Sequence, residues 1–187
     1  MGKREDILDA ALGIVSEGGI RALTLPVLFE HASTGAGTFY HYYRDREDLL
    51  ESVFAHCFDV ATRELADADE KGAPTRVRFD GLCSRLFSAY VRYPREFDFL
   101  YWYSFGYVQP DVTLCRVIPS VMLLTSIIAA AQKEGLIGDT SSASVLARVV
   151  RGMAASVFWG YQRGACVMDD DAARRFAEGA WRAISCL

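Results

Sequence analysis

A short run of residues between positions 36 and 42 carries hydroxyl groups and an imidazole at helical spacing. Thr38, Tyr40 and Tyr42 supply hydroxyls, and His41 supplies a ring that can donate or accept a hydrogen bond. A helix of this size fits the major groove of duplex DNA, where its hydroxyls and first backbone amides can reach phosphate oxygens. The run therefore indicates nucleic-acid binding that needs little positive charge.

Net charge gives no general support for such binding. The chain of 187 residues has a formal net charge of −4, and residues 1–50 carry five basic and eight acidic side chains. Binding to DNA must therefore depend on local geometry and not on a broadly basic surface.

No arrangement of residues typical of an enzyme active site is found in the sequence. There is no nucleophile elbow, no metal-ligand spacing and no pair of carboxylates in a recognisable catalytic setting. His56-Cys57 is too short a constellation to hold a metal, and the acidic run 169–171 is explained by the attraction of a helix N-terminus for acids. We expect no enzyme activity, no cofactor and no metal.

Composition indicates a folded soluble protein, and the first residues indicate a cytoplasmic one. Hydrophobic residues make up 51% of the chain and charged residues 24%. The most apolar stretch, Val117–Ala131, is shorter than the roughly 20 residues of a membrane helix. The first residues begin an amphipathic pattern without the apolar core of a signal peptide, and five scattered cysteines lack a Cys-x-x-Cys pair. We expect no membrane span, and reduced thiols.

Apolar residues recur at three- and four-residue spacing along the chain, which predicts an all-α fold of about nine helices. Gly18-Gly19 ends the first helix, and Thr24 caps the second. The later helices are predicted over 25–32, 36–42, 46 into the sixties, 79–93, 97–105, 110–134, 140–164 and 169–184. Three short helices that lead into a long one form a helix-turn-helix unit joined to a helical body.

The first fifty or so residues resemble the DNA-binding domain of the TetR family of bacterial transcriptional repressors. The matching stretches are Ile7–Leu12, Gly18-Gly19, Thr24-Leu25, Leu28, Ala32, Gly37–Tyr43 and Asp45–Leu50. The resemblance implies a helix-turn-helix domain over residues 1–48 and a ligand-binding, dimer-forming helical domain over residues 49–187. The second domain is similar to the family only in length, class and helix count.

The resemblance also implies roles for individual residues. Thr24 matches a threonine at the start of the family's second helix, and Arg46 occupies the place of a phosphate-binding lysine. Phe39 and Tyr43 are expected in the core of the domain. The predicted DNA-contacting residues are Thr24, Ala36, Thr38, Tyr40, His41, Tyr42 and Arg46.

Three positions depart from the family pattern. Phe29 replaces a small alanine, Gly35 replaces the usual serine cap, and Ala36 replaces a polar residue. The predicted helix over residues 36–42, which would enter the major groove, thus contains no Arg, Lys, Asn or Gln. These are the side chains that make strong bidentate contacts to bases. Base readout is expected to depend on His41, Thr38 and a contact of Ala36 with a thymine methyl, and to be weak or shape-dependent.

The last two predicted helices each carry an apolar face that includes small residues. The face residues are Ala143, Ala147, Val150, Ala154, Phe158 and Tyr161 on the first helix, and Phe176, Ala177, Ala180, Trp181 and Ile184 on the second. We expect two copies of the chain to pair these helices in a four-helix bundle and to bind a roughly palindromic operator. The alternative is that the faces pack only within the chain.

Aromatic residues exceed what packing tends to need, with 11 Phe, 9 Tyr and 3 Trp. Some of them are expected to line a cavity for a small apolar or aromatic molecule. The predicted lining residues are Tyr90, Phe97, Tyr101, Phe105, Met122, Phe158 and Trp159.

These observations predict a DNA-binding transcriptional regulator, a repressor that a small molecule releases from its operator. A molecule can do so only by binding two arrangements of the dimer with different affinity. The alternative is a helical interaction protein of the same fold whose N-terminal domain no longer binds DNA specifically.

Overall fold

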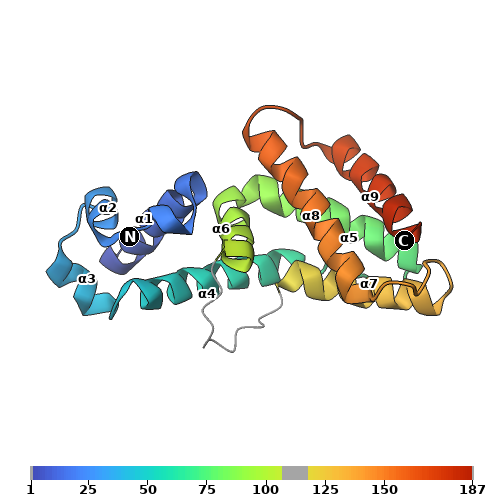
Figure 1. Ribbon diagram of the computed structural model, residues 1–187, viewed down its shortest axis with the longest axis horizontal. Coiled ribbons are helices and arrows are strands. Elements are labelled where there is room, and N and C mark those ends of the chain that lie inside the picture. Colours follow the sequence, from blue (N-terminus) through green and yellow to red (C-terminus); the bar gives the residue numbers. More distant parts are fainter. Residues whose placement is uncertain (1, 107–117, 187) are drawn as a thin grey trace. The chain divides into compact units, whose positions relative to one another are not determined.

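The computed structural model describes residues 2–106 and 118–186, with the side chains of residues 104–106 excepted. The described residues form nine α-helices and one 3₁₀ helix and no β-strand, which confirms the predicted all-α fold. The helices are α1 (Lys3–Gly18), η1 (Ile20–Ala22), α2 (Leu25–His31), α3 (Ala36–Tyr42), α4 (Arg46–Leu65), α5 (Thr75–Arg92), α6 (Pro94–Gly106), α7 (Pro119–Lys133), α8 (Ala143–Gln162) and α9 (Asp170–Ser185) (Figure 1).

The chain divides into two compact units. Unit 1 contains residues 1–60 and 93–113, and so includes α1 to α3, most of α4, and α6. Unit 2 contains residues 61–92 and 114–187, and so includes the end of α4 together with α5, α7, α8 and α9. The functional boundary predicted between residues 48 and 49 stays a prediction.

The centre of unit 1 is α1. This helix buries Ile7, Ala11 and Val15, and it ends where the N–H of Gly19 donates to the carbonyl of Val15 at 2.8 Å. Gly19 has a φ of +74°, which glycine adopts without strain. A Cβ at this position would lie 3.8 Å from the ring of Trp102, in ordinary contact, so it is the positive φ that favours glycine here.

Two polar contacts join α6 to α1. Arg95 donates to the Asp9 carboxylate at 2.7 Å, and the Ser16 hydroxyl donates to the Asp98 carboxylate at 3.5 Å. The aromatic segment of α6 is helical, as predicted, and its Phe99 is fully buried. The helix begins at Pro94, where a missing N–H costs no hydrogen bond.

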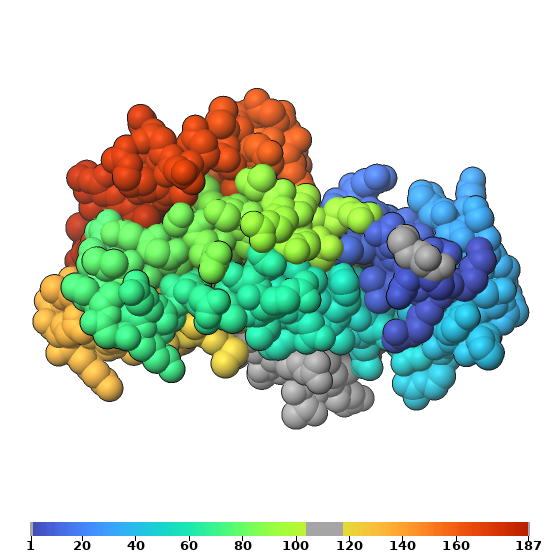
Figure 2. All heavy atoms as spheres, turned by 180° about the vertical axis from the view of Figure 1, so that it is seen from behind, coloured from blue at the N-terminus to red at the C-terminus, as the bar shows by residue number. Residues whose placement is uncertain are grey.

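The centre of unit 2 is α5, which packs against α9 on one side and α7 on the other (Figure 2). Its predicted apolar stripe is buried at Phe79, Leu82, Leu86 and Tyr90. Phe79 meets Trp181 of α9 edge to face, with ring centroids 5.1 Å apart. The stripe therefore forms the core of this unit.

The start of α7 differs from the prediction. One helix was expected from Pro110 to Glu134, but α7 begins at Pro119, after Ile118 with extended backbone angles of φ −51° and ψ 138°. Proline inside a continuous helix removes a hydrogen bond and clashes with the preceding turn, whereas proline at the first position does neither. Pro110 itself lies outside the described residues.

No helix in the described ranges is both long and apolar enough to cross a membrane. The four described cysteines are free: Cys57 and Cys83 are buried, and Cys166 and Cys186 are exposed. Burial raises the pKa of the Cys57 thiol and raises that of Cys83 to about 12, so both stay protonated at neutral pH. Cys115 lies outside the described residues.

Candidate functional site

The turn between α2 and α3 is closed by backbone hydrogen bonds. The N–H of Thr34 donates to the Phe29 carbonyl at 3.0 Å, and the N–H of Ser33 donates to the Glu30 carbonyl at 3.2 Å. Ser33 takes the left-handed conformation, with a φ of +45°, that glycine usually supplies at the end of a helix. The turn thus follows the end of α2 at His31 and leads into α3, which begins at Ala36.

Two buried aromatic residues anchor α3. Phe39 and Tyr43 are buried, as predicted for core residues. Phe29, the departure from the family pattern on α2, packs its ring against Phe39 with centroids 5.6 Å apart. The larger side chain at position 29 therefore fills the contact between the two helices of the motif.

The opposite side of α3 is exposed. Tyr40 and Tyr42 are 56% and 38% exposed, and His41 is also exposed, with its ring 4.8 Å from that of Tyr42. Ala36 is exposed, and Thr38 is half-buried. No side chain caps the first turn of α3, because the preceding residue is a glycine. Thr24 lies at the N-terminal cap position of α2, as predicted, but its exposed side chain makes no capping hydrogen bond.

Basic side chains flank the C-terminal end of α3. Arg44 follows the helix, and it pairs with Asp48 at 3.4 Å while its own side chain is 82% exposed. The backbone N–H of Arg44 also donates to Asp48, which lowers the pKa of that carboxyl. Arg4 of α1 lies over the ring of Tyr43, 5.8 Å from its centroid. Cations are favoured at this end of a helix and could also approach phosphate.

The predicted phosphate contact, Arg46, has its side chain directed at backbone carbonyls. Its Nε donates to the carbonyl of Leu23 at 2.5 Å, and Nη2 donates to that of Ile20 at 2.7 Å. Nη1 donates to the Glu47 carboxylate at 3.2 Å. Sequence reasoning could assign a charge to this position but not these acceptors, which lie more than twenty residues earlier in the chain.

Among the predicted ligand residues, the structure brings Tyr90 and Phe158 together. Their rings stack with centroids 3.9 Å apart and planes 14° apart, and both are buried. Trp159 is half-buried, and Met122 is 56% exposed on α7. These four residues belong to unit 2.

The other three predicted ligand residues lie on α6, in unit 1. Phe97 is buried at the edge of that unit's core, and Tyr101 is half-buried. The side chain of Phe105 lies outside what the structure describes. The predicted set is therefore divided between two units, and in unit 2 the rings of Tyr90 and Phe158 stack on each other.

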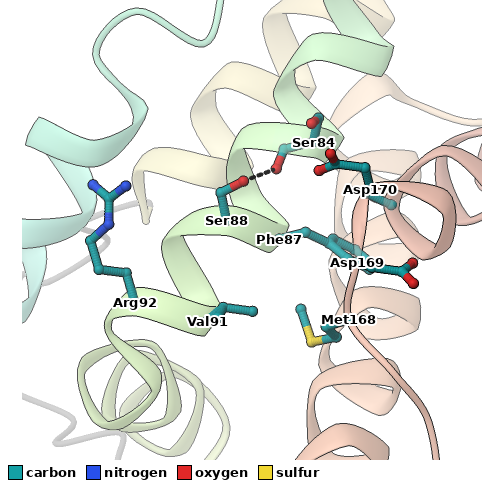
Figure 3. A pocket seen from close by; sticks show the side chains of 9 residues that line it. Ser84, Phe87, Ser88, Val91, Arg92, Met168, Asp169 and Asp170 are labelled. Atoms are coloured by element: carbon teal, nitrogen blue, oxygen red, sulfur yellow. Dashed lines mark hydrogen bonds between the residues drawn. The ribbon is translucent and has the colours of Figure 1, made fainter.

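A pocket of about 430 Å³ opens in unit 2 between α5 and the segment that leads into α9 (Figure 3). It is lined by Ser84, Phe87, Ser88, Val91, Arg92, Met168, Asp169, Asp170 and Ala173. The predicted ligand residues with described side chains are not among them. No sequence pattern identifies this set, because the pocket forms only where a face of α5 meets a distant loop.

The predicted dimer faces are largely used within the chain. The buried members are Ala147, Val150, Ala154, Phe158, Ala177, Ala180 and Ile184. The prediction that these side chains form an intersubunit bundle is therefore wrong for them, because they already pack against neighbouring helices of unit 2. The alternative, that the apolar faces pack within the chain, holds for these residues.

Comparison with known protein families identifies the N-terminal region. A family model described as "Bacterial regulatory proteins, tetR family" matches residues 7–53. The match covers α2, α3 and their turn, and so covers the helix-turn-helix geometry described above.

Curated relatives are transcriptional regulators. The HTH-type transcriptional repressor KstR of Mycolicibacterium smegmatis is 27% identical over 134 residues, which are 71% of this chain and 64% of that protein. The HTH-type transcriptional regulator BetI of Cronobacter sakazakii is 33% identical over 66 residues, or 35% of this chain and 31% of that one. The chain thus spans less than two thirds of the length of these relatives.

Solved structures share the fold over nearly the whole chain. A TetR family transcription regulator from a Shewanella species is similar with a TM-score of 0.78 at 15% identity, and 99% of each chain is covered. A TetR family protein from Vibrio parahaemolyticus is similar with a TM-score of 0.69 at 22% identity, and 98% of each chain is covered. At these identities the similarity concerns the fold.

Proposed function

Because this chain belongs to the TetR family of bacterial regulatory proteins, we propose that it is a cytoplasmic repressor that binds DNA as a homodimer and releases it on binding a small molecule. The observation that carries the proposal is the geometry of α3. Its buried Phe39 anchors the helix while Tyr40, His41 and Tyr42 face solvent. A short helix with this division is suited to entry into a major groove.

In this proposal the hydroxyls of α3 and of the residue before α2 contact the DNA backbone. Tyr40, Tyr42, Thr38 and Thr24 donate to phosphate oxygens, which positions the domain without specifying sequence. His41 is left to read a base edge, with the Ala36 methyl against a thymine methyl. Because α3 offers few base-reading groups, recognition depends partly on the shape of the duplex.

The proposed dimer uses the exposed faces of α8 and α9. Each helix carries an interior glycine, Gly152 in α8 and Gly179 in α9, and both are exposed. A Cβ at either position would meet nothing within 4 Å in the chain. Glycine costs a helix interior about 1 kcal/mol relative to alanine, so packing within the chain gives no reason for these two residues. Glycine at these two positions would instead allow the helices of a second copy to approach closely.

Neighbouring residues support this surface. On α8, Val145 is 52% exposed, and Ser156 is exposed one turn after Gly152. Because α8 and α9 pack against each other in unit 2 (Figure 1), we propose that a second copy contacts exposed residues of both helices. Two copies related by a twofold axis would then build a four-helix bundle, and their two α3 helices would meet a roughly palindromic operator.

For the ligand, we propose the pocket beside α5. Phe87, Val91 and Met168 supply an apolar part. The carboxylate of Asp170 supplies hydrogen-bond acceptors, and so does that of Asp169, which also caps α9 by accepting from the Ala172 N–H at 2.8 Å. Such a lining suits a small apolar or aromatic molecule that carries a donor or a positive charge. Arg92, the basic residue of the lining, already pairs with Glu64 at 3.0 Å.

The pocket connects to the predicted aromatic pair through one ring. Phe87 contacts Phe158 at a centroid distance of 5.3 Å, and Phe158 stacks on Tyr90. Phe87 also contacts Phe176 of α9 at 5.1 Å. A molecule bound against Phe87 would therefore press on both helices that carry the proposed dimer surface. It acts as an inducer only if it binds the DNA-free arrangement more tightly.

A variant that fills the pocket tests this proposal. Ser88 is exposed on α5 and lines the pocket, so Ser88→Phe should occupy its mouth without disturbing the core. Small amphipathic compounds that stabilise the unaltered chain in a thermal-shift screen and release it from DNA should act on the variant at least roughly tenfold more weakly. DNA affinity without compound should not change.

The matched control is Ser126→Phe, which adds the same ring at an exposed position of α7. Compounds should act on this control as on the unaltered chain. Equal responses of Ser88→Phe and the unaltered chain would place the ligand elsewhere, and stabilising compounds that never affect DNA binding would contradict a ligand-responsive repressor.

A further inference from the structure

Arg46 ties the start of α4 to the segment that precedes α2. Its guanidinium donates to the carbonyls of Ile20 and Leu23, at 2.7 Å and 2.5 Å, and its side chain is only 24% exposed. Leu23 directly precedes Thr24, the residue at the N-terminal cap of α2. The contact therefore joins two elements of unit 1 that are separated by the whole helix-turn-helix motif.

The chemistry of this contact requires arginine. A planar guanidinium presents neighbouring N–H donors in a fixed fork, so one side chain can hold two carbonyls at once. Both bonds are assisted by the positive charge, which makes them stronger than neutral hydrogen bonds. A lysine ammonium is a single point with rotating donors, and it is not pre-organised to keep both carbonyls in place.

The surroundings make the contact rigid. Ile20 and Leu23 are buried, as are Leu49 and Leu50 near the start of α4. The carbonyls that Arg46 binds thus belong to two residues whose side chains are fixed by burial. Hydrogen bonds of this kind lock a geometry because their partners cannot move independently.

We propose that Arg46 is a positioning residue, which makes the α2–α3 pair and the N-terminal turns of α4 move as one body. The proposal rests on the proposed DNA-binding function and deepens it. Because α4 runs from residues of unit 1 into residues of unit 2, a change in the direction of α4 is passed through this contact to the segment that precedes α2, and from there to the α2–α3 pair. A direct phosphate contact by Arg46, as the family resemblance implies, is the competing role.

The test compares Arg46→Lys, which keeps the charge, with Arg46→Met, which keeps length and helix propensity. Each is measured against duplexes at several salt concentrations, at a temperature where circular dichroism shows the variant folded. A positioning role predicts that Arg46→Lys loses roughly tenfold in affinity while its salt dependence stays that of the unaltered chain. It also predicts weaker discrimination, by at least roughly fivefold, against an operator with one base pair inserted between half-sites.

Hydrogen exchange gives a readout that needs no DNA. Amides of residues 20–32 should exchange at least roughly tenfold faster in Arg46→Lys, while those of α5 are unchanged. The competing phosphate contact predicts a different pattern. Arg46→Lys would then show the DNA affinity and amide exchange of the unaltered chain, and in Arg46→Met the slope of log affinity against log salt would fall by about one per site. A lower melting temperature with unchanged affinity, spacing preference and exchange would also overturn the proposal. An unaltered chain that binds no duplex refutes the proposed function itself, which is a separate outcome.

Discussion

Replacing Tyr40 by glutamate is expected to lower the affinity of the dimer for its DNA site at least about 100-fold at roughly 0.1 M salt. Tyr40 is 56% exposed on α3, where the proposal sets its hydroxyl against a phosphate. The variant loses that hydrogen bond and places a carboxylate beside the phosphate, at both half-sites. A hydrogen bond to a charged group contributes about 1.5–3 kcal/mol, so two lost bonds alone account for the effect.

Folding should be almost unaffected by this change. The ring of Tyr40 contacts only the edge of Phe39 among the described ring contacts of α3, and glutamate is a good helix former. Ala55→Glu, at an exposed position of α4, adds the same charge to the same unit and should bind DNA nearly as the unaltered chain does. Mobility shifts and thermal unfolding of the two variants make the comparison. Equal binding by Tyr40→Glu and Ala55→Glu would show that α3 does not face DNA.

The second large effect is expected at the proposed dimer surface. Gly152→Leu or Gly179→Leu should raise the dimer dissociation constant at least about 30-fold, because each leucine overfills the bundle at two symmetry-related places. Overpacking costs about 1–3 kcal/mol for each place, and 2 kcal/mol already corresponds to that factor. Operator affinity should fall with dimerisation, since one chain can engage only one half-site.

Sedimentation velocity over a concentration series measures this directly. Ser126→Leu on α7 is the control for an added exposed leucine, and it should sediment as the unaltered chain does. The two glycine variants should keep their helix content, because leucine is a better helix former than glycine and a Cβ at either position meets nothing within 4 Å. Variants that remain dimeric at micromolar concentration would exclude this surface of α8 and α9.

Local sequence signals predicted the fold well. The bounds of α3, the buried positions of Phe39 and Tyr43, and the apolar stripe of α5 all follow from periodicity and turn residues. The start of α7 was missed although Pro119 marks it, because the apolar run around that proline hides the helix start. Proline position was the better guide there.

Contacts between distant segments could not be predicted in the same way. Periodicity identifies the apolar face of a helix, and in α8 and α9 that face is taken by the chain's own core. The surface proposed for a second copy is marked instead by Gly152 and Gly179, whose significance appears only when the space around them is known. The same holds for Arg46, since its charge is visible in the sequence but the Ile20 and Leu23 carbonyls are not.

The most direct test of a dimeric DNA-binding regulator is selection of binding sites from a pool of random duplexes by the purified, compound-free chain. The account predicts enrichment of an inverted repeat whose half-sites lie about one helical turn, or a multiple of it, apart. The enriched duplex should bind a dimer, and the Tyr40→Glu chain should enrich nothing. A pool that stays random, or a site without twofold symmetry, would contradict the account and favour a helical interaction protein whose N-terminal domain has lost specific DNA binding.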